Sequence, residues 1–165
     1  MRILGIDPGY GITGFGLIDS ERGQSKLITC GAITTPAGMD FSARLEIIYN
    51  DMCELLRQAK PDAVAIEELF FGQNVTTGIG VAQARGVVLL AIRQAGLEVT
   101  SYKPMQVKLS LVGYGNATKR QMMDMTKRLL HLSAMPKPDD AADAIAIALC
   151  HARSATSLLS QVGSK

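Results

Sequence analysis

Four acidic residues, far apart along the chain, are the side chains of this sequence best suited to catalysis. Asp7 and Glu67 each end a short apolar segment, whereas Asp140 and Asp143 lie three residues apart among alanines and isoleucines. Carboxylate oxygens are the ligands preferred by hard divalent cations, and two such ions ~3.5–4 Å apart can activate a water and stabilise the leaving oxygen of a phosphodiester. If the four side chains converge, the sequence predicts metal-dependent phosphodiester hydrolysis.

Each acid also has a purely structural explanation. Asp7 precedes a Pro-Gly pair and could form a turn. Glu67 could mark the exit of a strand into solvent, and Asp139 and Asp140 could cap a helix and oppose its dipole, the explanation we prefer for Asp139. Asp143 is different, because its apolar neighbours would make an unpaired charge costly. We therefore expect Asp143 to have a partner.

Hydrophobic periodicity and turn signals predict the elements that position these acids. If the strands that end at Asp7 and Glu67 are parallel neighbours, both side chains meet at one edge of a sheet. Asp140 and Asp143 project from one helix face, about a turn apart. The order of elements is typical of an α/β domain with a mixed sheet, and the strand order stays open. The predicted strands cover 2–7, 13–18, 26–34, 63–66 and 99–102, and the predicted helices cover 41–59, 77–94, 106–112, 118–132 and 139–154.

Composition indicates one globular unit. The chain has 165 residues, 47% of them hydrophobic, so we expect a single domain over residues 1–154 and a flexible, Ser-rich tail over 155–165. No apolar run approaches the ~20 residues that cross a bilayer, so we expect a cytoplasmic protein with no membrane contact. Three cysteines at wide spacings favour reduced thiols over a disulfide frame or a zinc site.

The basic residues are concentrated in one third of the chain. Residues 93–137 carry eight Lys and Arg against two acids, a charge of +6, whereas residues 1–92 carry seven against ten, a charge of −3. A basic block of this kind suits a polyanion such as nucleic acid, although solvated helix faces can have the same composition.

The acids fall within a set of motifs that resembles a known family. The set agrees in order and spacing with the crossover junction endodeoxyribonuclease RuvC family, and the resemblance covers nearly the whole chain, to about His151. Its motifs are Gly5-Ile6-Asp7-Pro8-Gly9, Thr13-Gly14-Phe15-Gly16, Ala65-Ile66-Glu67, Gln83-Ala84-Arg85-Gly86, Gln106-Val107-Lys108 and Asp140-Ala141-Ala142-Asp143-Ala144.

The resemblance implies a fold, an activity and partners. The implied fold is RNase H-like, a mixed five-stranded sheet of three antiparallel strands followed by two parallel ones, flanked by helices. The implied activity is hydrolysis of two symmetric phosphodiesters in a four-way (Holliday) DNA junction during recombination and repair. Two Mg²⁺ ions per active site, for which Mn²⁺ can substitute, a homodimer and the branch-migration proteins RuvA and RuvB are the implied cofactors and partners.

The resemblance also assigns roles to particular residues. It makes all four acids both catalytic residues and metal ligands. It places Lys108 and Lys119 at positions that contact DNA near the site, with Lys119 also acting in catalysis, and Phe70 at a position that packs against a junction base. Because Phe71 follows directly, either ring could face the DNA.

Three further interpretations concern residues outside the acids. The helix predicted over 77–94 has a small-faced stretch of glycine and alanine, which makes it our candidate for the dimer contact. We assign Arg85 to the packing or interface of this helix, and not to catalysis. We assign His151 to the end of the last helix, where a cation opposes the dipole.

Three other functions could account for parts of this pattern. A sugar-kinase or actin-like ATPase needs a second lobe, for which 165 residues leave no room. A junction-binding domain without chemistry would be expected to lack an acid, and all four acids are present. A nuclease acting on RNA or RNA-DNA hybrids stays open, because both substrates share the phosphodiester reaction.

Overall fold

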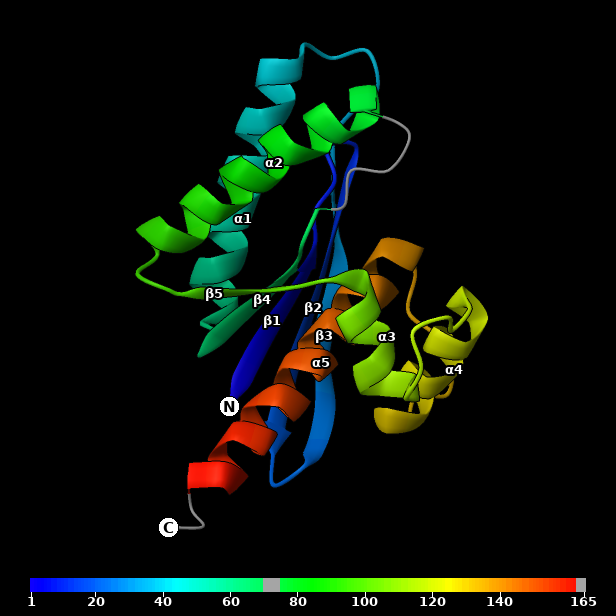
Figure 1. The fold of residues 1–165 in the computed structure, drawn as a ribbon. Coiled ribbons are helices and arrows are strands. Elements are labelled where there is room, and N and C mark those ends of the chain that lie inside the picture. The colour runs from blue at the N-terminus through cyan, green and yellow to red at the C-terminus, as the bar shows by residue number, and fades with distance from the viewer. Residues whose placement is uncertain (70–74, 163–165) are drawn as a thin grey trace.

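A five-stranded mixed sheet forms the centre of the computed structural model, which describes residues 1–69 and 75–162 (Figure 1). The sheet order is β3-β2-β1-β4-β5, with β1, β2 and β3 antiparallel and β4 and β5 parallel to β1. This confirms the predicted arrangement. The strands are β1 (Arg2–Asp7), β2 (Ile12–Glu21), β3 (Gln24–Thr34), β4 (Ala63–Glu67) and β5 (Val99–Tyr102).

Helices cover both faces of the sheet (Figure 1). One face is covered by α1 and α2, and the other by α5, with α3 and α4 packed beside it. The central strand β1 is buried on both faces because Ile3, Leu4 and Ile6 have no exposed surface. Its continuous apolar sequence is typical of such a strand. The helices are α1 (Phe41–Ala59), α2 (Val75–Gln94), α3 (Pro104–Val112), α4 (Lys119–Leu129) and α5 (Asp139–Val162).

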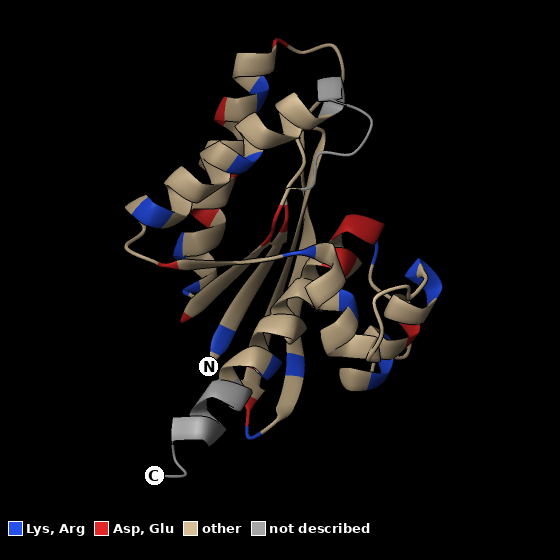
Figure 2. Ribbon diagram, in the orientation of Figure 1, with Lys and Arg blue, Asp and Glu red and all other residues tan. Residues whose placement is uncertain are grey.

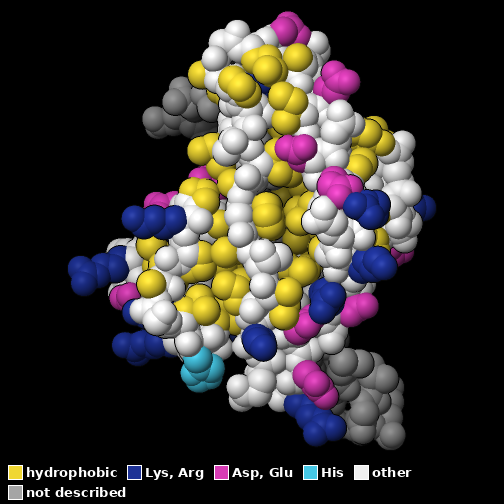
Figure 3. Space-filling view, turned by 180° about the vertical axis from the view of Figure 1, so that it is seen from behind, with side chains coloured by type: hydrophobic (Ala, Val, Ile, Leu, Met, Phe, Trp, Pro, Cys, Tyr) yellow, Lys and Arg dark blue, Asp and Glu magenta, His cyan; other side chains and the backbone are white. Residues whose placement is uncertain are grey.

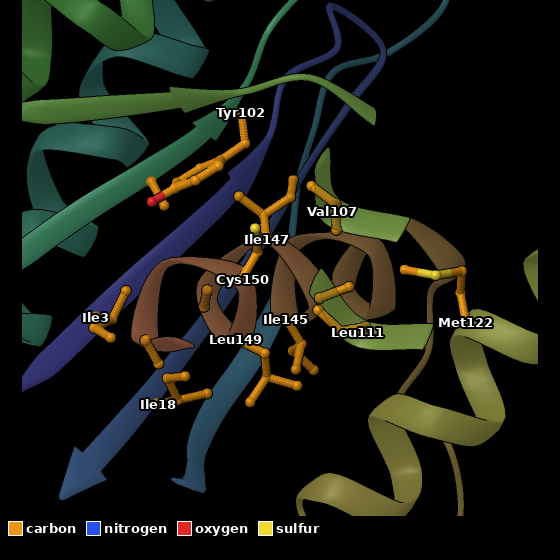
Figure 4. Close-up of a cluster of buried hydrophobic side chains, with 14 of the residues drawn as sticks. Ile3, Ile18, Tyr102, Val107, Leu111, Met122, Ile145, Ile147, Leu149 and Cys150 are labelled. Carbon is orange, nitrogen blue, oxygen red and sulfur yellow. The ribbon is translucent and has the colours of Figure 1, made fainter. Parts of the chain in front are cut away.

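The cluster of buried side chains on the α5 side connects every element that contributes to the site (Figure 4). Figure 4 shows Ile145 and Ile147 of α5 among side chains from β1, β2, β5, α3 and α4. Both isoleucines are 2% exposed or less. Because most residues of α5 between Ala141 and Ala152 are buried and apolar, the helix is held on the sheet chiefly by hydrophobic burial.

Local hydrogen bonds and backbone conformations set the ends of the helices. Helix α1 has the predicted bounds, since the Asp40 carboxylate accepts hydrogen bonds from the backbone N–H groups of Ser42 and Ala43, and Lys60 ends the helix in a left-handed conformation. Helix α4 ends at Leu129, earlier than predicted, and the chain turns at a positive φ of 52° at His131.

Helix α5 extends to Val162, past the predicted end at Ser154. The flexibility of residues 155–165 therefore stays a prediction. Among the described residues no helix is both long and apolar enough to cross a membrane. The three cysteines are free thiols, of which Cys150 is buried.

Candidate active site

The strand register brings Asp7 and Glu67 to the same edge of the sheet. Ile6 of β1 pairs with Ile66 of β4 in parallel, so the next residue of each strand is one of these two acids. Both strands end there, at the carboxyl edge where α/β sheets usually place their ligands. The two carboxylates predicted to converge therefore lie on adjacent strand ends.

Two strand glycines bring the acids of α5 to that edge. A Cβ atom added at Gly14 would lie 2.1 Å from the backbone oxygen of Asp140, and one at Gly5 would lie 2.0 Å from the backbone oxygen of Ala144. No side chain fits in that space, so glycine permits the direct approach of α5. Because Gly14 also pairs with Asp7 across β1 and β2, the backbone of Asp140 lies close to Asp7.

The pKa values of Asp7 and Glu67 show that these acids lie in one shared environment. Burial, and then the negative charges of neighbouring acids, raise the pKa of the Asp7 carboxyl from 3.8 to about 8. Burial also raises the pKa of Glu67, with a further contribution from the charge of Asp143, against a lowering hydrogen bond with Asp7. Like charges and desolvation both disfavour ionised carboxyls. The acids that act on Asp7, in decreasing order, are Glu67, Asp143 and Asp140.

A cavity of about 220 Å³ opens between the strand ends and helices α3, α4 and α5. Figure 2 shows acidic ribbon at the strand ends and at the start of α5, with basic segments of α3 and α4 nearby. Apolar side chains from the three helices complete the wall. Its charged lining residues are Asp7, Glu67, Lys108, Lys119 and Asp143.

Lys119 is ion-paired with the acids of α5. Its Nζ lies 3.3 Å from Oδ2 of Asp143 and 3.2 Å from Oδ2 of Asp139. The partner that the sequence predicted for Asp143 is therefore a lysine of α4, although the Asp143 side chain is itself 43% exposed. Lys108 lines the same cavity from α3, so the structure brings both predicted lysines to the acids.

Arg85 was not assigned to the site from the sequence, yet it contacts a strand that forms the site. Its Nε donates a hydrogen bond of 3.1 Å to the backbone oxygen of Glu67, and its Nη2 donates one of 2.8 Å to Oγ of Ser101. These bonds tie α2 to the ends of β4 and β5. Arg85 is also the sole charged residue between Glu68 and Arg93, and that isolation was the available signal.

The remaining predictions concern Phe70, Phe71 and His151. Phe70 and Phe71 lie outside the described residues, so their contact with DNA stays a prediction. The assignment of His151 to the end of α5 was wrong, because the helix continues for eleven residues to Val162. His151 is instead half-buried, with Nδ1 3.0 Å from the hydroxyl of Tyr102, and burial lowers its pKa.

The acids offer the donor chemistry that a hard divalent cation requires. The half-buried carboxyls of Asp7 and Glu67 share a hydrogen bond, and positive charge between them would stabilise both in the ionised form. As the side chains lie, however, no group of three or more His, Cys, Asp or Glu among the described residues is arranged to hold a metal ion. Lys119 pairs with Oδ2 of Asp143, so a cation bound through that oxygen would displace the lysine.

Comparisons with known proteins agree with this architecture. A profile of the family "Crossover junction endodeoxyribonuclease RuvC" matches residues 3–151. The RuvC protein of Chloroflexus aurantiacus is 52% identical over 158 residues, which cover 96% of each chain.

Solved structures agree as well. The Thermus thermophilus RuvC structure has a TM-score of 0.88 and 36% identity, covering 95% of this chain and 96% of that one. The same protein in complex with Holliday junction substrate has a TM-score of 0.87 and 34% identity, with the same coverage of both chains. Sequence and fold together therefore establish that this chain belongs to the crossover junction endodeoxyribonuclease RuvC family.

Proposed function

We propose that the four-acid site hydrolyses two symmetric phosphodiesters of a four-way DNA junction, resolving it during recombination and repair. The observation that carries the proposal is the convergence of Asp7, Glu67, Asp140 and Asp143 at one end of the sheet. Membership of the RuvC family supports it, as does the junction bound by the T. thermophilus relative.

RuvC nucleases are metal-dependent. We propose two Mg²⁺ ions, replaceable by Mn²⁺, with the four acids as their ligands. Bound there, such ions would supply positive charge that activates a water and stabilises the leaving oxygen. The protein contributes the cavity itself, whose wall combines the acids and lysines with apolar side chains of α3, α4 and α5.

The lysines of the cavity have a role that does not depend on the ions. Lys108 and Lys119 bring two positive charges to the cavity mouth, where they can neutralise a phosphate and the charge that builds up during cleavage. Basic side chains also project from the side of the molecule on which α4 lies (Figure 3). Helix α4 itself carries Lys119, Arg120, Lys127 and Arg128, and such a basic surface suits the phosphate backbone of DNA.

A homodimer follows from the two-fold character of the substrate. A four-way junction offers two equivalent strands to cut, and a two-fold enzyme presents two equivalent sites. Helix α2 exposes Ile79 at 54% and Leu90 at 51%, and a Cβ added at Gly86 between them would have no atom within 4 Å. We infer that this face of α2 contacts the second subunit. RuvA and RuvB remain the proposed partners in branch migration.

The decisive test compares three substrates. A synthetic four-way junction, a linear duplex and an RNA-DNA hybrid are incubated with the protein in Mg²⁺ or in EDTA. Paired nicks confined to the junction, and lost in EDTA, are expected. Asp7→Asn should abolish them, whereas Asp51→Asn, which removes an exposed carboxylate of α1, should not. Cleavage of the hybrid alone would refute the proposal and favour the RNA-directed alternative.

A further inference from the structure

Asp139 shares the ammonium group of Lys119 with Asp143. The two carboxylates are 3.2 Å and 3.3 Å from the same Nζ atom. Asp143 lines the acid cavity, whereas Asp139, the first residue of α5, is not part of that lining. Lys119 therefore bridges a carboxylate inside the cavity and one at its rim.

Lys119 occupies an unfavourable position in its own helix. It is the first residue of α4, next to the N-cap Thr118, and the first turn of α4 contains no acid. A cation there opposes the positive end of the helix dipole. The acids at the start of α5 offset this cost, because they lie at a second positive helix end, where negative charge is favourable.

We propose that Asp139 is a positioning residue, which holds Lys119 at the cavity mouth when a divalent cation takes the carboxylate of Asp143. This inference rests on the proposed function for its consequence in cleavage. Without Asp139, Lys119 has one remaining carboxylate partner in its ion pair, and it competes with the cation for that partner. With Asp139, the lysine leaves Asp143 and stays beside the substrate phosphate.

Two measurements test the inference in four proteins: wild type, Asp139→Asn, Lys119→Met and the double variant. The first is Mg²⁺ binding, measured by titration calorimetry without DNA. Asp139→Asn should weaken binding about two- to five-fold in the presence of Lys119, the range expected from a partly exposed ion pair. In the Lys119→Met background the loss should be clearly smaller, because only the distant charge of Asp139 is then removed.

The second measurement is junction cleavage at saturating Mg²⁺. Asp139→Asn should lower kcat about two- to five-fold with little change in KM, and should have no effect in the Lys119→Met background. Asp139→Glu should retain most of the activity. Asp124→Asn, which removes an exposed carboxylate from α4, is the matched control and should leave both measurements unchanged.

A purely structural role for Asp139 predicts a different pattern. If Asp139 only stabilises the start of α5, Asp139→Asn would lower the melting temperature and change Mg²⁺ binding by the same factor with or without Lys119. Equal factors in the two backgrounds would overturn the inference. If the wild type fails to cut the junction, the proposed function fails, yet the Mg²⁺ titrations still decide whether Asp139 and Lys119 are coupled.

Discussion

Replacing Asp7 by asparagine should stabilise the metal-free protein at neutral pH while abolishing cleavage. In the folded chain, burial and the charges of neighbouring acids raise the pKa of Asp7 to about 8. In the unfolded chain the same carboxyl has its ordinary pKa of 3.8. Asparagine has nearly the same shape and no charge, so it removes the repulsion and the cost of burying an ionised group.

The sign and size follow from proton linkage. Between pH 3.8 and about 8 the folded state binds a proton that the unfolded state has released, so stability falls as pH rises. Each pH unit corresponds to ~1.4 kcal/mol, which gives at most ~5 kcal/mol at pH 7.5 and ~1 kcal/mol at pH 4.5. Since side chains can also move apart to lessen repulsion, we expect Asp7→Asn to gain about 2–5 kcal/mol at pH 7.5.

Urea denaturation in EDTA, at several pH values from 4.5 to 8.5, measures this gain. The difference between Asp7→Asn and wild type should grow with pH, whereas Asp51→Asn should follow the wild type throughout. Saturating Mg²⁺ should then stabilise the wild type more than the variant, because cation binding offsets the repulsion that the variant lacks. A difference between the two proteins that is absent at pH 7.5, or that is constant with pH, would refute this account of the acid cluster.

Four further substitutions test the packing of α5, the contacts of Arg85 and Lys108 at the site, and the dimer. Gly14→Ala should destabilise the protein by about 3 kcal/mol or more, as measured by urea titration. The reason is that the added Cβ would lie 2.1 Å from the backbone oxygen of Asp140. A change below ~1 kcal/mol would contradict the close packing of α5. Arg85→Gln should lower kcat about ten-fold by freeing the end of β4, with Mg²⁺ affinity reduced in calorimetry. Lys108→Ala should slow cleavage and leave the urea midpoint nearly unchanged, because the lysine lines the cavity and is not part of either buried cluster. Leu90→Glu should shift the sedimentation coefficient to that of a monomer, whereas a wild type that is itself monomeric at micromolar concentration would contradict the dimer.

Much of the fold could be predicted because its signals are local. The apolar run from Arg2 to Asp7 and the helical spacing between Phe41 and Ala59 each act within a few residues. The predicted end of α5 at Ser154 was wrong because that prediction, too, used only local signals. The Ser-rich composition after residue 154 weakens the helical pattern, although the helix continues to Val162.

The order of residues is enough to reveal which groups could do the chemistry, because it shows an acid at the end of an apolar strand and two acids spaced on one helix face. How these groups meet depends on the three-dimensional packing. The pairing of β1 with β4, the approach of α5 through Gly5 and Gly14, and the bonds of Arg85 and Lys119 join segments tens of residues apart. Such contacts depend on how whole elements pack, and no local pattern encodes them.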